Sequence, residues 1–142
     1  GILGLSFKSG TDDLRCSPIV DVAEALLGKG YEIQIYDKNV RISQLTGTNA
    51  DFIAAKIPHL HQIITDDLDE VCSACDVLVI TNKEKEFAEV PEKYPHKVIV
   101  DLVRQFKKLD YEGNYEGISW GNINVNPAQK DEVERTMVRT EF

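Results

Sequence analysis

The chain has 142 residues, a length that suits one globular domain with a buried core. Its formal net charge of −8 argues against a protein that binds DNA or RNA, although one or two local cations suffice for a small anionic ligand. No apolar run approaches the roughly 20 residues that cross a bilayer, and no signal peptide is visible. We therefore expect a cytoplasmic protein whose partners are neither membranes nor nucleic acids.

The first predicted elements are a buried strand and an amphipathic helix. Residues 2–7 form an apolar run that is typical of a buried strand. Ser17 is expected to cap a helix that has Pro18 at its first position, and Gly28 and Gly30 end this helix. Apolar residues at helical spacing give it one buried stripe: Ile19, Val22, Ala23, Leu26 and Leu27.

The next segments continue the alternation of strands and helices. Residues 31–36 alternate apolar and polar side chains, which predicts a strand more exposed than the first, with Asp37 at its end. A short helix is expected at 49–56 and a short strand at 62–65.

The second half of the chain contains two continuous apolar runs, at 76–80 and 97–100, a pattern typical of strands covered on both faces. Further elements are expected as follows: a helix capped by Asp66 or Asp67 and ending near residue 74, a helix at 83–88 that stops before Pro91, and a last strand at 117–120.

Strands that alternate with helices predict an α/β fold, a Rossmann-like, doubly wound and mainly parallel sheet in three α/β/α layers. Residues 1–121 form this domain, and residues 122–142 are a tail that is either a short helix or disordered. Ligands of such sheets bind beyond the carboxyl ends of the strands. Several polar residues are expected to gather at that edge: Lys8 beside Phe7, Asp37, Thr81, Asn82 and Asp101.

The usual dinucleotide fingerprint G-x-G-x-x-G is absent, because Gly4 and Gly10 are separated by a loop with bulky Phe7 and Lys8. Asp37 stands where a ribose-binding acid would stand, but without the glycine turn we interpret it as a solvated residue at a strand end. The main cofactor pocket is therefore not expected in this domain.

Two cations near the first strand are the candidate binding residues. Lys8 follows the strand directly, so its ammonium either neutralises a phosphate at the ligand edge or is an ordinary surface lysine. Arg15 either grips a pyrophosphate with its fork or forms a salt bridge with Asp12 or Asp13. Arg104 also follows a predicted strand, but its lysine neighbours suggest a solvated basic turn.

The three cysteines do not indicate catalysis or metal binding. An odd number without a secretory signal is typical of reduced cytosolic thiols. Cys16 lies near a helix start but far in sequence from any histidine, so we interpret it as inert. Cys72 and Cys75 form a C-x-x-C pair on a helix without a second pair, so no metal site is expected.

One frame, G-L-x-F-K-x-x-T-D-D-x-R, contains both candidate cations and resembles the nucleotide-sugar 6-dehydrogenases, the UDP-glucose and GDP-mannose dehydrogenase family. The similarity is to their C-terminal, nucleotide-sugar-binding domain and covers about residues 1–120. It is carried by these segments: Gly4 to Lys8, Thr11 to Arg15, Ser17-Pro18, Tyr36-Asp37, Asp66 to Val71, Asp76 to Ile80, Val98 to Val103 and Glu116 to Trp120. Ile57-Pro58-His59 and Asp101-Leu102-Val103 resemble the branch that acts on GDP-mannose.

The resemblance implies a reaction in which two NAD+ oxidise a sugar C6 alcohol to a carboxylate through a cysteine thioester. It implies that Lys8 contacts the nucleotide sugar and that Arg15 reaches an NAD bound mainly by an N-terminal domain. The family's catalytic cysteine segment is absent from these 142 residues, and Cys16 does not match it. We therefore expect no catalytic residue and no metal ligand here, and no activity of the chain alone.

The chain begins inside a predicted strand and without a methionine, so we expect a piece of a longer protein. The resemblance implies that the intact enzyme is a homo-oligomer. Within the family, a domain of a UDP-sugar 6-dehydrogenase is the alternative to a GDP-mannose enzyme. Outside it, the alternatives are a non-catalytic nucleotide-binding module and an oligomerisation module.

Overall fold

A computed structural model describes residues 1–40, 46–107, 111 and 113–118. Its strands form one sheet in the order β3-β2-β1-β4-β5-β6, and every neighbouring pair is parallel. The strands are β1 (Ile2–Leu3), β2 (Ile35–Tyr36), β3 (Ile64–Thr65), β4 (Val77–Ile80), β5 (Val98–Asp101) and β6 (Tyr115–Gly117). This is the strand order of the doubly wound dinucleotide fold, so the predicted Rossmann-like α/β class is confirmed.

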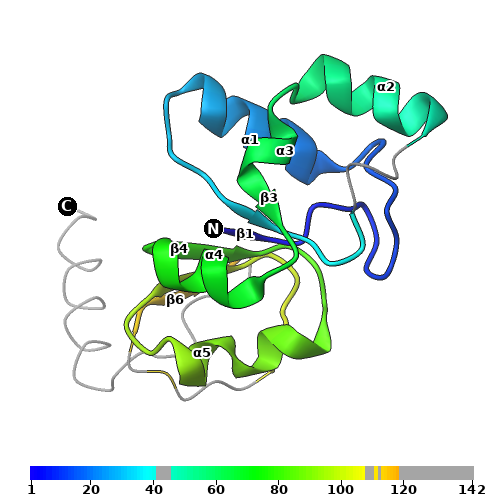
Figure 1. Cartoon of the computed structure of the whole chain (residues 1–142). Coiled ribbons are helices and arrows are strands. Elements are labelled where there is room, and N and C mark those ends of the chain that lie inside the picture. Colours follow the sequence, from blue (N-terminus) through cyan, green and yellow to red (C-terminus); the bar gives the residue numbers. More distant parts are fainter. Residues whose placement is uncertain (41–45, 108–110, 112, 119–142) are drawn as a thin grey trace, which may run out of the picture.

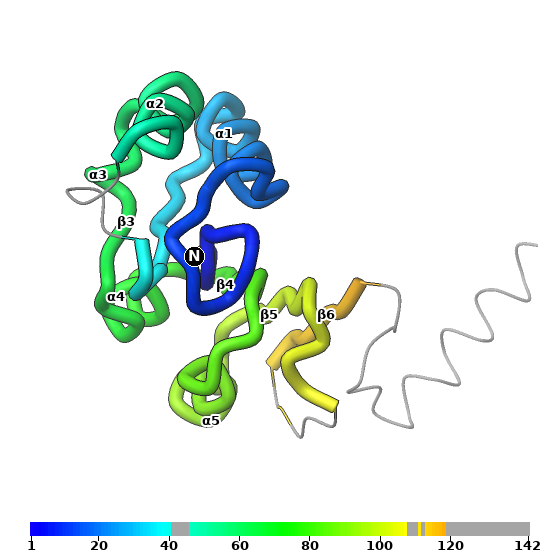
Figure 2. The backbone as a smooth tube through the Cα atoms, turned by 90° about the vertical axis from the view of Figure 1, so that its right-hand side faces the viewer, coloured from blue at the N-terminus to red at the C-terminus, as the bar shows by residue number. Residues whose placement is uncertain are grey.

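Helices cover both faces of the sheet (Figures 1 and 2). They are α1 (Pro18–Gly28), α2 (Gly47–Lys56), α3 (Leu60–Ile63), α4 (Leu68–Ala74), the 3-10 helix η2 (Lys85–Glu89) and α5 (Val90–Lys93). Because neighbouring strand residues point to opposite faces, β1 contributes to two separate cores. Ile2 packs in the cluster that includes α1 and α2 residues, and Leu3 packs in the cluster of α4, η2 and α5.

One half of one sheet face is less covered than the sequence predicts. Val77 is 42% exposed, and Val79, Val98 and Val100 are only half-buried. Their neighbours Leu78, Ile80 and Ile99 point to the other face and are fully buried. The prediction that 76–80 and 97–100 are covered on both faces is therefore wrong. Since the chain leaves β5 in a loop, no helix of the described residues lies over this half.

The first strand is shorter than predicted because the chain leaves it at Gly4, whose φ is +103°. A Cβ atom here would lie 2.9 Å from atoms of both Thr81 and Asn82. The Thr81 hydroxyl donates to the carbonyls of Leu3 and Gly4, and the Asn82 amide donates to the Ser6 carbonyl at 3.1 Å. The loop after β1 therefore crosses directly over the end of β4.

Several element boundaries also differ from the predictions. Ser17 is the N-cap residue and Pro18 begins α1, as predicted, but the Ser17 hydroxyl donates to the Leu5 carbonyl at 2.7 Å and makes no capping hydrogen bond. Val22 is 44% exposed, and Val20 is buried instead. Pro91 lies in the first turn of α5, where proline costs no hydrogen bond, rather than ending a helix.

Other predicted elements are confirmed in part. Asp67 caps α4 by accepting hydrogen bonds from two backbone amides of its first turn. The helix predicted at 49–56 is α2, which starts two residues earlier. Of the strand predicted at 62–65, only the last two residues are a strand, β3. The last strand begins at Tyr115 rather than at 117. The predicted tail, 122–142, lies outside the described residues. Among the described residues, every helix is too short or too polar to traverse a bilayer.

A buried carboxylate, Asp37, joins the loops that follow β1 and β2. It is only 4% exposed. One oxygen accepts from the amides of Leu5 and Ser6 at 2.9 and 3.1 Å, and the other accepts from those of Asn39 and Val40 at 2.9 and 3.3 Å. The interpretation of Asp37 as a solvated strand-end residue is therefore wrong. Its charge is compensated by four backbone amides, which is how a buried carboxylate is stabilised.

We expect Asp37→Ala to lower the free energy of unfolding by about 3–5 kcal/mol, because it leaves four backbone amides without their acceptor. Asp66→Ala is the matched control, since Asp66 is exposed and makes no side-chain hydrogen bond with a described residue; its effect should stay below about 0.5 kcal/mol. Urea unfolding of both variants measures the difference, and equal losses would contradict the structural role of Asp37.

Candidate functional site

The candidate site lies at the carboxyl edge of the sheet, where the loops after β1, β4 and β5 meet. The predicted gathering of polar residues at this edge is confirmed, because Asp37, Thr81, Asn82 and Asp101 are all buried there. Their side chains bond to the neighbouring loops instead of facing a ligand. They therefore shape the site, and other residues form its accessible surface.

Lys8 lies on a tight loop that fixes its backbone and leaves its side chain free. Its carbonyl oxygen accepts from the Thr11 amide at 3.2 Å, the Thr11 hydroxyl at 2.8 Å and the Ser6 hydroxyl at 3.1 Å. The Lys8 side chain is exposed and forms no ion pair with a described residue. The structure thus presents, at the ligand edge, an exposed ammonium that no described carboxylate pairs with, on a hydrogen-bonded backbone.

Phe7, directly before Lys8, is 62% exposed although it is a large apolar side chain. An exposed aromatic ring beside an ammonium offers a ligand both a flat apolar surface and a positive charge. The sequence analysis placed Phe7 at this edge but did not identify it as a contact residue. The available signal was an aromatic residue placed directly before the candidate cation.

A second buried carboxylate, Asp101, shapes the loop after β5. It is fully buried and accepts from the backbone amides of Val103 at 3.0 Å and Gln105 at 2.7 Å and from the Tyr115 hydroxyl at 2.6 Å. Between these amides, Arg104 adopts a left-handed backbone with φ +53°, which is uncommon for a residue other than glycine. Its side chain is exposed as a result.

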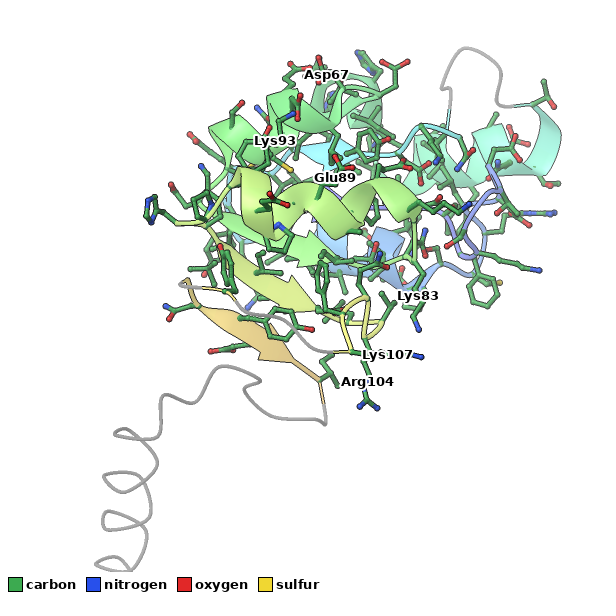
Figure 3. The ribbon with its side chains drawn as sticks, turned by 90° about the horizontal axis from the view of Figure 1, so that it is seen from below. Asp67, Lys83, Glu89, Lys93, Arg104 and Lys107 are labelled. Atoms are coloured by element: carbon green, nitrogen blue, oxygen red, sulfur yellow. The ribbon has the colours of Figure 1, made fainter. Side chains whose placement is uncertain are left out.

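Arg104 belongs to a group of cations on adjacent loops. Figure 3 shows it with Lys83 and Lys107. The Gln105 side chain donates to the Glu84 carbonyl at 2.9 Å, which joins the loops after β4 and β5. The Ser9 hydroxyl donates to the Lys83 carbonyl at 3.1 Å, which joins the Lys8 loop to the same place.

Lys8, Lys83, Arg104 and Lys107 form no ion pair with a described residue, and we call them the edge cations. In a chain of net charge −8, this edge therefore presents four cations that no described carboxylate pairs with. Such an arrangement attracts an anion with several oxygens, such as a diphosphate. The interpretation of Arg104 as part of a solvated basic turn agrees with its exposure, but it missed this grouping.

Arg15 differs from the edge cations because it forms an ion pair within the fold. Its guanidinium binds both Asp13 oxygens, with Nε–Oδ1 at 2.9 Å and Nη2–Oδ2 at 3.0 Å, and donates to the Thr48 hydroxyl at 3.2 Å. The hydrogen bond from Arg15 lowers the pKa of the Asp13 carboxyl. In this structure, Arg15 therefore forms the predicted salt bridge with Asp13, although its side chain is still 53% exposed.

A polar cavity of about 300 Å³ adjoins Arg15, at the start of α2. It is lined by Asp12, Asp13, Arg15, Thr46, Thr48 and Asn49. The Asn49 side chain accepts from the Leu14 amide at 3.2 Å and donates to the Asp12 carbonyl at 2.8 Å, so it fastens α2 to the Arg15 loop. Nothing in the sequence distinguishes Asn49 from any other polar residue of a short helix.

The cysteines carry no reactive arrangement. Burial raises the pKa of the Cys72 thiol to about 11, which keeps it protonated near neutral pH. Cys16 is exposed, and its φ of +59° places it in a left-handed turn between Arg15 and the start of α1. In the described part of the chain, no group of three metal-binding side chains comes together. No described cysteine forms a hydrogen bond with a histidine, so none has an adjacent general base.

Comparison with known proteins identifies the relatives of this chain. Residues 1–108 match the model of the "UDP-glucose/GDP-mannose dehydrogenase family, UDP binding domain". The chain is 48% identical over 121 residues to the GDP-mannose 6-dehydrogenase of Pseudomonas aeruginosa, covering 84% of this chain and 28% of the relative. It is 32% identical over 87 residues to the UDP-glucose 6-dehydrogenase of Rickettsia bellii, covering 61% of this chain and 18% of that relative.

The solved structures lead to the same group. A crystal structure of a ternary complex of GDP-mannose dehydrogenase from Pseudomonas aeruginosa superposes with a TM-score of 0.72 at 47% identity, covering 84% of this chain and 28% of that one. The chain thus spans little more than a quarter of the length of these relatives. With the family model matched over residues 1–108 and the parallel sheet in the 3-2-1-4-5-6 order, the chain belongs to the UDP-glucose/GDP-mannose dehydrogenase family.

Proposed function

We propose that residues 1–121 are the C-terminal, nucleotide-sugar-binding domain of a GDP-mannose 6-dehydrogenase. The complete enzyme would oxidise the C6 alcohol of GDP-mannose to the carboxylate of GDP-mannuronate with two NAD+, acting in the cytoplasm as a homo-oligomer. The observation that carries the binding role is the exposed, unpaired Lys8 on a rigid loop at the carboxyl edge of the sheet. The 48% identity to a GDP-mannose 6-dehydrogenase supports the choice of sugar nucleotide.

In this proposal the edge cations bind the diphosphate of the nucleotide sugar. Lys8 supplies the central charge, since the hydrogen bonds to its own carbonyl fix its backbone before the ligand arrives. A preorganised cation loses less conformational freedom on binding than a mobile one. Phe7 offers an exposed ring next to this charge for a flat or apolar part of the ligand.

The backbone of this domain does not suit the primary binding of NAD. In a dinucleotide-binding domain, the amides after the first strand bind the pyrophosphate. Here the amides of Leu5 and Ser6 already donate to Asp37, and bulky Phe7 and Lys8 occupy the turn. We therefore propose that another domain binds most of the NAD, which accepts the hydride when bound.

Arg15 fits a supporting contact to that cofactor. Its guanidinium is half exposed and lines a polar cavity, so it can bind a pyrophosphate oxygen while it keeps its hydrogen bond to the Thr48 hydroxyl. The Asp13 salt bridge orients the guanidinium, and both groups are exposed enough for the pair to rearrange at little cost. The assignment of Arg15 to NAD rests on the family resemblance together with this exposure.

A UDP-sugar enzyme is the alternative within the family, since UDP-glucose 6-dehydrogenases are relatives at lower identity. We expect calorimetric titration of the complete protein to give tighter binding of GDP-mannose than of UDP-glucose. Tighter binding of UDP-glucose than of GDP-mannose would mean that the substrate is a UDP-sugar. The proposed role of the edge cations would be unchanged.

Lys8→Ala in the complete enzyme is expected to raise the KM for GDP-mannose about ten- to hundred-fold. The change removes a charge-assisted contact of roughly 1.5–3 kcal/mol. Lys29→Ala is the matched control, because Lys29 is an exposed lysine at the far end of α1, away from the carboxyl edge. Steady-state kinetics compare the two variants, and an unchanged KM and kcat for Lys8→Ala would remove Lys8 from the site.

The chain alone is expected to have no dehydrogenase activity, because its described residues contain no activated nucleophile and no dinucleotide-binding turn. Incubation of the isolated chain with GDP-mannose and NAD+, followed by NADH absorbance, tests this expectation. The complete enzyme serves as the positive control. Measurable turnover by the chain alone would show that it contains a catalytic site.

A further inference from the structure

Glu84 contacts three loops of the carboxyl edge at once. One carboxylate oxygen accepts from the Gly10 amide at 3.1 Å, and the other accepts from the Lys38 ammonium at 3.1 Å. Its backbone carbonyl accepts from the Gln105 side chain at 2.9 Å. Glu84 itself follows β4, so it connects the loops after β1, β2, β4 and β5.

The partner of Glu84 on the β2 side is itself held in place. Lys38 binds Glu86 at 2.7 Å as well as Glu84, and Glu86 also accepts from the Tyr36 hydroxyl at 2.7 Å. The hydrogen bond to Glu86, assisted by the one to Glu84, raises the pKa of Lys38. Lys38 therefore remains charged over the whole physiological pH range and keeps its ion pairs with both carboxylates.

The Lys8 loop depends on this contact for its position. Among the described residues, the tip of this loop, Ser9 and Gly10, makes two hydrogen bonds to another loop, from the Ser9 hydroxyl to the Lys83 carbonyl and from the Gly10 amide to Glu84. Gly10 has a φ of +76°, and a Cβ atom there would meet nothing within 4 Å. No described atom packs against this side of Gly10, so the inferred position of the tip rests on the two hydrogen bonds.

Glu84 is an acid beside the edge cations, yet it does not neutralise them. Its side chain is only 17% exposed, and its two oxygens are occupied by Lys38 and the Gly10 amide. The exposed ammonium of Lys8 and the guanidinium of Arg104 consequently have no ion pair with a described residue.

We infer that Glu84 is a positioning residue of the nucleotide-sugar site, which holds the Lys8 loop against the loops after β4 and β5 so that the edge cations face one anion. This inference rests on the function proposed above. Glu84 contacts no ligand in this role. It acts through the Gly10 amide and through Lys38.

The test compares Glu84→Ala and Glu84→Gln with wild type in the complete enzyme. Glu89→Ala is the control, because Glu89 lies on the 3-10 helix that begins directly after Glu84, is exposed and makes no side-chain hydrogen bond with a described residue. Hydrogen exchange of the peptide containing Gly10 is measured together with KM and kcat for GDP-mannose and NAD+. The exchange does not depend on any ligand, so it tests the loop contact separately from the proposed function.

Glu84→Ala is expected to speed exchange at Gly10 about tenfold and to raise the KM for GDP-mannose roughly 3- to 10-fold, with kcat and the KM for NAD+ within about twofold. Glu84→Gln keeps an acceptor for Gly10 but loses the charge that binds Lys38, so its effects should be intermediate. A variant that had only lost stability would instead change kcat and both KM values together, or would leave all three unchanged.

Unchanged exchange at Gly10 would overturn the inference, because Glu84 would then not hold the loop. Faster exchange with an unchanged KM for GDP-mannose would also overturn it, because the loop position would not matter for binding. A wild-type enzyme that binds and oxidises a UDP-sugar instead would correct the proposed function, and the same KM comparison with that sugar nucleotide would decide the role of Glu84. A wild-type enzyme that uses neither sugar nucleotide would overturn both proposals.

Discussion

The whole carboxyl edge of this domain depends on two buried carboxylates that accept hydrogen bonds from backbone amides. Loops that cross the ends of parallel strands bury amide groups, and each buried amide without an acceptor is costly. Asp37 satisfies four of them in the loops after β1 and β2, and Asp101 satisfies three in the loop after β5. Each carboxylate thereby fixes the path of a loop that carries an exposed cation.

The buried carboxylates of this edge and the edge cations are not paired with one another. The carboxylates at the edge have partners within the fold: backbone amides for Asp37 and Asp101, and Lys38 for Glu84. None of them pairs with the edge cations, so a strongly acidic chain still presents a positive edge. Asp37 also occupies the amides of Leu5 and Ser6, which lie where a dinucleotide-binding domain would bind a pyrophosphate.

Much of the fold was predictable because it depends on local pattern. The apolar run of β4, the Pro18 helix start and the Asp67 cap all follow from neighbouring residues, and the alternation of strands and helices implies a parallel sheet. Lys8 was predictable as an edge residue because it directly follows an apolar run. Glu84 and Asn49 were not, because their partners lie 74 and 35 residues away in the chain and no local pattern marks them.

The sequence by itself determined the α/β class, the family and the two cations of the G-L-x-F-K-x-x-T-D-D-x-R frame, because these depend on the order and spacing of residues. Only the tertiary structure decided that Asp37 is buried, that Glu84 and Asn49 bond to the loop after β1, and that half of one sheet face is open. The reason is physical: burial and pairing depend on which distant loops meet at the sheet edge, and that meeting is set by the strand order and not by neighbours in the chain.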